Sequence, residues 1–246
     1  MKSGWRHRPV VLWAFALVAA GFFCMLGFWQ LGRAEWKRDL LQRASQALSD
    51  RRPKPPGVIG DAARDRAYDW VEVEGRFVDA PAVLLDNQGR DGRVGVRAYR
   101  VFAIAGGPAV LVDLGWVAIP GDRRMPTVPR DAARTRLTGL LLPPPAKGLA
   151  LGEPAALPHG DLLVTWVDPV ALRARLHAPT LAPRVLRPAP EAGFGFERDF
   201  DILPNTMPPE RHVGYAVQWF ALSATVLVTA VVLTLRRRRR ATGVPA

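Results

Sequence analysis

His212 is the side chain with the clearest potential for chemistry, because it stands immediately before an uncharged apolar run, residues 213–235. On a helix, Tyr215 or Ala216 follows one turn later and Trp219 two turns later on the same face. A neutral imidazole above an apolar, aromatic surface is what an axial ligand of haem iron requires. Histidine and aromatic residues are also common at membrane interfaces, so the residues alone leave an interfacial role open.

A second group of residues with binding potential lies at the end of the other apolar run. On a helix, this stretch would present two adjacent stripes of side chains. One contains Trp29, Arg33 and Trp36, and the other, which is polar, contains Gln30, Arg33 and Lys37. Gln218 lies at a similar depth in the run after His212. A glutamine inside a membrane usually bonds to another helix, a contact worth about 1 kcal/mol. The two apolar runs are therefore predicted to pack on each other through Gln30 and Gln218.

Enzyme chemistry is mostly excluded by residue types. Between the apolar runs the serines are Ser45 and Ser49, and no G-x-S-x-G occurs. The chain also lacks G-x-x-x-x-G-K-[ST], H-E-x-x-H and C-x-x-C. Its single cysteine, Cys24, lies in the first apolar run, so the middle segment has no disulfide or zinc framework. We expect a protein that is not an enzyme. One acidic cluster without a defined partner is interpreted as a solvated strand face: Asp65, Asp69, Glu72 and Glu74.

The two apolar runs predict two membrane spans. Residues 9–32 and 213–235 carry no charge, and each run exceeds the roughly 20 residues that cross a bilayer. A signal peptide cleaved near Ala20 is the alternative for the first run, but apolar residues continue through Phe28, as in an anchor. Residues 33–48 are rich in helix formers and predict a membrane-proximal helix that ends before Pro53.

Charge sets the expected orientation. The net charge of +12 would suggest nucleic-acid binding, but eight positive charges belong to Lys2, Arg6, Arg8 and the arginines 236–240, and the middle segment carries only +4. Both basic clusters adjoin an apolar run, so the positive-inside rule places both termini in the cytoplasm. We expect membrane lipids as neighbours and no nucleic-acid partner. The predicted division is a cytoplasmic tail (1–9), a span (10–32), a membrane-proximal helix (33–52), a periplasmic domain (53–211), a span (212–235) and a basic cytoplasmic tail (236–246).

The middle segment is predicted to be rich in β-structure. Apolar residues alternate with polar ones from Val71 to Phe77, which is typical of a half-buried strand. Asp168 as N-cap and Pro169 at the first helical position predict one short helix that includes Leu172 and Leu176. Strands are predicted at 71–77, 83–87, 94–104, 109–119, 136–142, 162–167 and 184–187. The fold class is thus an α+β membrane protein in which two transmembrane helices flank a mainly antiparallel β domain, a sheet or barrel with one short helix.

Three motifs together resemble the surfeit locus cytochrome oxidase assembly family, and the resemblance covers the whole chain. They are Gly27-x-Trp29-Gln30-x-x-Arg33-x-x-Trp36-Lys37, Leu111-Val112-Asp113-x-Gly115-Trp116-Val117 and His212-x-x-Tyr215-Ala216-x-Gln218-Trp219-Phe220. The third motif is the most specific. Members of the family assist maturation of haem-copper cytochrome c oxidase at the insertion of haem a into subunit I. The resemblance therefore implies a haem a chaperone whose partner is subunit I, with haem A synthase as a further candidate partner.

The resemblance also implies which residues hold the cargo. Bacterial relatives bind haem a through the histidine that matches His212, with the tryptophan that matches Trp219 nearby, and Tyr215 belongs to the same motif. Our own inference is that the haem propionates reach cations, for which Arg33, Lys37 and Arg211 are the candidates. Because no mitochondrial targeting segment is recognised before the first span, we expect a bacterial inner-membrane protein. The alternative is a membrane-anchored periplasmic binding or sensor domain without haem.

Overall fold

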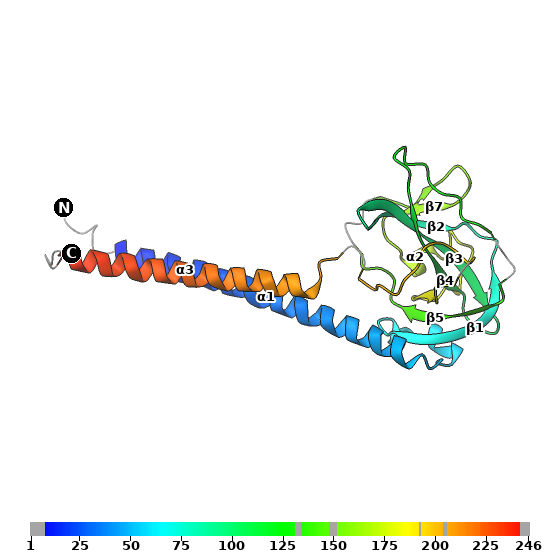
Figure 1. Ribbon diagram of the computed structural model, residues 1–246, viewed down its shortest axis with the longest axis horizontal. Coiled ribbons are helices and arrows are strands. Elements are labelled where there is room, and N and C mark those ends of the chain that lie inside the picture. The colour runs from blue at the N-terminus through cyan, green and yellow to red at the C-terminus, as the bar shows by residue number, and fades with distance from the viewer. Residues whose placement is uncertain (1–7, 131–133, 148–151, 192, 204–205, 242–246) are drawn as a thin grey trace. The chain divides into compact units, whose positions relative to one another are not determined.

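The structure, a computed structural model, describes residues 8–130, 134–147, 152–191, 193–203 and 206–241 (Figure 1). These residues form two compact units. A helical unit contains the described residues up to Leu40 and from Met207 onward, and a β unit extends from Leu41 to Thr206. Two long apolar helices thus flank a sheet domain in the sequence, as the patterns predict.

The helical unit consists of α3 (Pro209–Ala241) and the larger part of α1 (Arg8–Asp50). By length and composition both helices are able to cross a membrane. α1 runs without a break through residue 33, where the predicted span passes into the predicted membrane-proximal helix. The helix stops before Pro53, and Arg51 has a φ of 42°. α3 continues through the arginines 236–240, which the sequence assigns to a tail.

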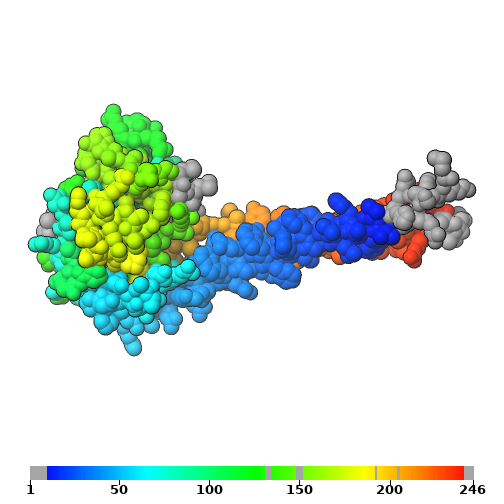
Figure 2. Space-filling view, turned by 180° about the vertical axis from the view of Figure 1, so that it is seen from behind, coloured from blue at the N-terminus to red at the C-terminus, as the bar shows by residue number. Residues whose placement is uncertain are grey.

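α1 and α3 pack against each other within the helical unit (Figures 1 and 2). Trp13 Nε1 donates to Thr234 Oγ1 (3.0 Å), and Ser223 Oγ donates to the carbonyl oxygen of Ala20 (3.0 Å). Small residues let two helices approach closely. Those buried here are Ala16, Ala20, Gly27 and Ala34 of α1 and Ala216, Ser223 and Ala230 of α3. The predicted pairing of the two apolar helices is therefore confirmed.

The β unit contains one sheet, and all of its strands except the short β6 lie near the predicted positions. They are β1 (Asp69–Phe77), β2 (Val83–Arg90), β3 (Arg93–Ile104), β4 (Val110–Ala118), β5 (Arg136–Leu142), β6 (Ala155–Ala156), β7 (Leu162–Val164) and β8 (Val185–Pro188). A ring closes as β1 pairs with β5, β5 with β8, β8 with β4, β4 with β3, and β3 with β1. β2, β7 and β6 extend the sheet outward from β3. The unit is thus a small closed barrel with an attached flap of sheet.

The pairing is mainly antiparallel, as predicted, but two ladders are parallel. These ladders join β2 to β7 and β4 to β8. α2 (Pro169–Leu172) is shorter than the sequence predicts. Asp168 does cap it by accepting from the amides of Val170 and Ala171, whereas Leu176 is buried beyond the helix end. Two 3-10 turns, η1 (Pro56–Ile59) and η2 (Ala62–Arg64), connect α1 to β1.

Both faces of the sheet are apolar. One face carries a cluster that includes Val71, Phe102 and Val112, and the other carries Leu111 and Leu140 together with Leu176 and Leu181. The last turns of α1, which belong to the β unit, add Ala47 and Leu48 to the second cluster. A strand covered on both sides is apolar along its length rather than alternating. This explains why β4 is a continuous apolar run interrupted by Asp113.

Asp113 is fully buried between two arginines from neighbouring strands. Its Oδ2 accepts from Arg97 on β3 (2.8 Å) and from Arg187 on β8 (2.8 Å), and its Oδ1 accepts from the amide of Gly115 (3.0 Å). Burial alone would raise the pKa of the Asp113 carboxyl, but Arg187 and Arg97 hold it below its usual value of 3.8. The middle sequence motif therefore contributes to the packing of the barrel.

Asp69 corrects the interpretation of the acidic cluster. The sequence assigns it to a solvated strand face, yet its side chain is 2% exposed and accepts from the fully buried Arg184 (2.7 Å). Arg64 pairs with the same carboxylate. The sequence pattern misses this pair because Arg184 lies 115 residues away along the chain. Glu72 and Glu74, by contrast, are exposed, as predicted.

Candidate functional site

His212 lies in the first turn of α3, against α1. The helix begins at Pro209, a residue that suits a first helical position. The side chain of His212 is 7% exposed, and its Nδ1 lies 2.7 Å from Oε1 of Gln30. The residue with the clearest chemistry in the sequence is therefore buried in the contact between the two apolar helices.

The two ring nitrogens of His212 differ in their surroundings. The oxygen of Gln30 can only accept, so Nδ1 carries the proton and donates it. Nε2 is buried and has no hydrogen-bond partner among the residues that the structure describes. In a neutral ring, Nε2 then holds a lone pair that no donor uses. A buried polar atom without a partner is uncommon and requires an explanation, of which binding of a metal is one.

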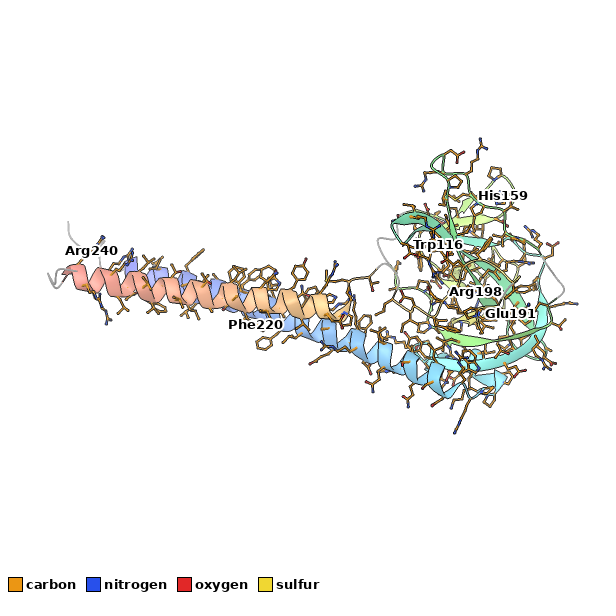
Figure 3. The ribbon with its side chains drawn as sticks, in the orientation of Figure 1. Trp116, His159, Glu191, Arg198, Phe220 and Arg240 are labelled. Atoms are coloured by element: carbon orange, nitrogen blue, oxygen red, sulfur yellow. The ribbon has the colours of Figure 1, made fainter. Side chains whose placement is uncertain are left out.

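Aromatic side chains lie below His212 on the same helix pair. Trp219 stacks on Phe23 with ring centroids 5.8 Å apart and an interplanar angle of 20°. Phe220 (labelled in Figure 3) meets Phe28 edge-on, with centroids 5.2 Å apart. A Cβ added to Gly27 would come within 2.6 Å of the Phe220 ring, so this glycine makes room for it. The sequence predicts the place of Trp219 but gives no sign of its contact with Phe23.

The three cations predicted as partners for the propionates differ in their contacts. Lys37 is 5% exposed and donates to the carbonyl oxygen of Met207, just before α3 begins. This bond holds the start of α3 and uses one of the three N–H donors of Lys37, so its role as a partner for propionates stays a prediction. Arg33 is exposed, with its guanidinium carbon 4.8 Å from the centre of the Trp36 ring. Arg211 is exposed as well. Arg33 and Arg211 thus remain accessible to an anionic group.

Two further candidates lie outside the contact between the helices. Tyr215 is 42% exposed, whereas Ala216 is 1% exposed and takes the position one turn below His212. The sequence leaves open which of the two shares the face of His212, and the structure assigns it to Ala216. Gln218 is exposed too, so the prediction that it joins the helix contact is wrong. Gln30 does join the contact, and its partner is His212.

The contact between the helices predicts a specific crosslink. Cys24 Sγ lies 3.3 Å from Ser223 Oγ, so Ser223→Cys should form a disulfide with Cys24 under mild oxidation. A protease site placed at the exposed Gly121 would separate the two helices into different fragments, which should stay joined until reductant is added. Leu222→Cys is the matched control, because Leu222 is 45% exposed. Equal crosslinking of both variants would show that α1 and α3 do not pack in this register.

Comparisons with known proteins agree with the motifs of these helices. Residues 17–224 match the SURF1 family. Uncharacterized SURF1-like proteins of Mycobacterium bovis and Mycobacterium tuberculosis are each 26% identical over 142 residues, which is 55% of this chain and 50% of the relative. A SURF1-like protein of Dictyostelium discoideum is 29% identical over 116 residues, covering 42% of this chain and 40% of that protein. Each alignment thus covers half or less of the relative's length.

Proposed function

The chain belongs to the SURF1 family of cytochrome oxidase assembly factors, and from this premise we propose that it binds haem a and assists its insertion into subunit I of cytochrome c oxidase. One observation carries the proposal. The buried imidazole of His212 is held through Nδ1, while Nε2 has no partner among the described residues. A single imidazole suits haem, because the porphyrin itself supplies four ligands of the iron. Haem is cargo here, and the family is one of assembly factors rather than enzymes.

The surrounding residues suit the other parts of such a cargo. Trp219 and Phe23 present aromatic surface two to three turns below His212, which an apolar macrocycle can contact. Arg33 and Arg211 are exposed cations near the same end of the helix pair and are able to pair with propionates. Stacking on Trp36 leaves the N–H edge of the Arg33 guanidinium available for a carboxylate.

The proposed location is a bacterial inner membrane, which α1 and α3 both cross. The arginines 236–240 follow the apolar part of α3, and Figure 3 shows Arg240 at its end. This charge favours cytoplasmic termini and a periplasmic β unit. A reporter that works only in the periplasm should be active when fused at Gly121 and inactive at the C-terminus. The reverse pattern would contradict this orientation.

The proposed function is tested by transfer of cargo. The protein should be purified in detergent from cells that make haem a, with haem A synthase as the proposed source of the cargo. We expect bound haem a in its visible spectrum and movement of that haem to subunit I that lacks it. If the protein carries haem but none reaches subunit I, the insertion role is wrong. If it carries no haem at all, the proposal fails in favour of a periplasmic binding or sensor domain.

A further inference from the structure

We infer that Gln30 is a positioning residue, which fixes the ring of His212 in the tautomer and orientation that leave Nε2 ready to bind iron. The inference deepens the proposed function and rests on it. It starts from one contact, the 2.7 Å hydrogen bond from His212 Nδ1 to Gln30 Oε1. Partners of this kind commonly set which nitrogen of a ligating histidine is protonated, and they raise its basicity.

The argument depends on how protons are shared in a neutral imidazole. One nitrogen carries the proton and the other carries a lone pair, and only the lone pair binds a metal. The side-chain oxygen of Gln30 cannot donate, so the bond selects the form with the proton on Nδ1. Without this acceptor the ring can also place its proton on Nε2, where it would block ligation. Gln30 therefore determines the fraction of His212 that is competent to bind.

The contact is separable from the packing of the helices. The pair is also held by the bond from Ser223 to the Ala20 carbonyl oxygen and by the Phe28–Phe220 contact. These contacts lie deeper along α1 than Gln30. Removing the amide of Gln30 should therefore leave α1 and α3 together while freeing the ring of His212. The Cys24–Ser223 crosslink described above reports whether a variant retains this packing.

The test compares Gln30→Met, which keeps the length of the side chain and removes the acceptor, with Gln30→Glu, which retains an acceptor. Gln218→Met is the matched control, because Gln218 is exposed. Nitrogen-15 chemical shifts of labelled histidine, measured on haem-free protein, distinguish the two tautomers. The chain has four histidines, and the signal absent from His212→Ala identifies the ring in question. Affinity for haem a is measured separately by titration.

In the haem-free wild-type protein we expect the proton on Nδ1. Gln30→Met should give a mixture of tautomers and bind haem a about 10- to 100-fold more weakly, the usual effect of losing such a partner. Gln30→Glu should restore most of the loss, and Gln218→Met should match the wild type. An unchanged tautomer, or unchanged affinity despite a changed tautomer, in a crosslinking-competent Gln30→Met variant would overturn the inference. Haem binding by the wild type would then still support the proposed function, whereas a wild type without haem would remove that function itself.

Discussion

Replacing His212 by alanine should reduce the haem content of the purified protein to background and abolish the Soret band of bound haem. The substitution removes the proposed iron ligand, and Ala216, one turn below on the same face, has no ligand atom to replace it. The protein should be produced together with haem a synthesis, purified in detergent and measured for haem per protein. The β unit should stay folded, because His212 belongs to the helical unit.

Two variants sharpen this expectation. Trp219→Ala removes aromatic contact and no ligand, so haem should be held roughly 5- to 150-fold more weakly, equivalent to about 1 to 3 kcal/mol, with little change in the Soret position. His177→Asn removes an exposed imidazole of the β unit and should leave haem content unchanged. Wild-type haem content with an unaltered spectrum in His212→Ala would refute ligation by this residue.

Replacing Asp113 by asparagine should destabilise the β unit by about 3 to 5 kcal/mol. The change leaves the guanidinium groups of Arg97 and Arg187, 4% and 2% exposed, without the carboxylate that compensates their charge. Urea unfolding of the full chain in detergent, followed by tryptophan fluorescence, measures the loss. Trp116 and Trp70 lie in this unit and report its unfolding.

Asp79→Asn provides the control for surface ion pairs. The Asp79 side chain is 94% exposed and pairs with Arg130, so its loss should change stability by less than about 1 kcal/mol. An Asp113→Asn variant as stable as this control would show that the buried carboxylate contributes nothing to the barrel.

The Asp113 carboxyl should also make stability depend on pH. Its pKa in the folded protein lies below the usual 3.8, since Arg187 and Arg97 outweigh the opposing effect of burial. Its contribution to the free energy of unfolding is therefore fully present above pH 3.8. This contribution is lost as the pH falls through the lower pKa of the folded state. Unfolding curves of the wild type and Asp113→Asn should converge as the pH is lowered below that value.

The sequence predicts those elements whose cause is local. An uncharged apolar run defines each long helix, and a capping aspartate with Pro169 marks the start of α2. The continuity of α1 is also local in cause, because helix formers continue beyond residue 33, where the apolar run ends. Polarity decides which part of a helix suits a membrane, not where the helix ends.

Contacts between residues that are far apart in the sequence cannot be predicted from such local patterns. The sequence identifies Gln30 and His212 as notable, but they lie 182 residues apart and meet only because the two helices pack in one register. Asp113 is equally distinctive in its apolar strand, yet its partners come from β3 and β8. Periodicity indicates which face of a strand or helix is buried. It does not say which neighbour covers that face.

The covered position of Nε2 in His212 has a consequence for delivery. Under the proposed function, iron can reach this nitrogen only after the side chains that cover Nε2 move aside. The bond from Nδ1 to Gln30 lies on the other side of the ring and stays in place, so only the covered arrangement of Nε2 and the loaded protein exclude each other. The measured affinity then equals the intrinsic affinity multiplied by the fraction of molecules in which Nε2 is uncovered. Each 1.4 kcal/mol by which the arrangement that covers Nε2 is favoured weakens retention about tenfold. Covering of Nε2 would thus return free energy when haem departs, which fits the proposed role of a carrier that must release what it binds.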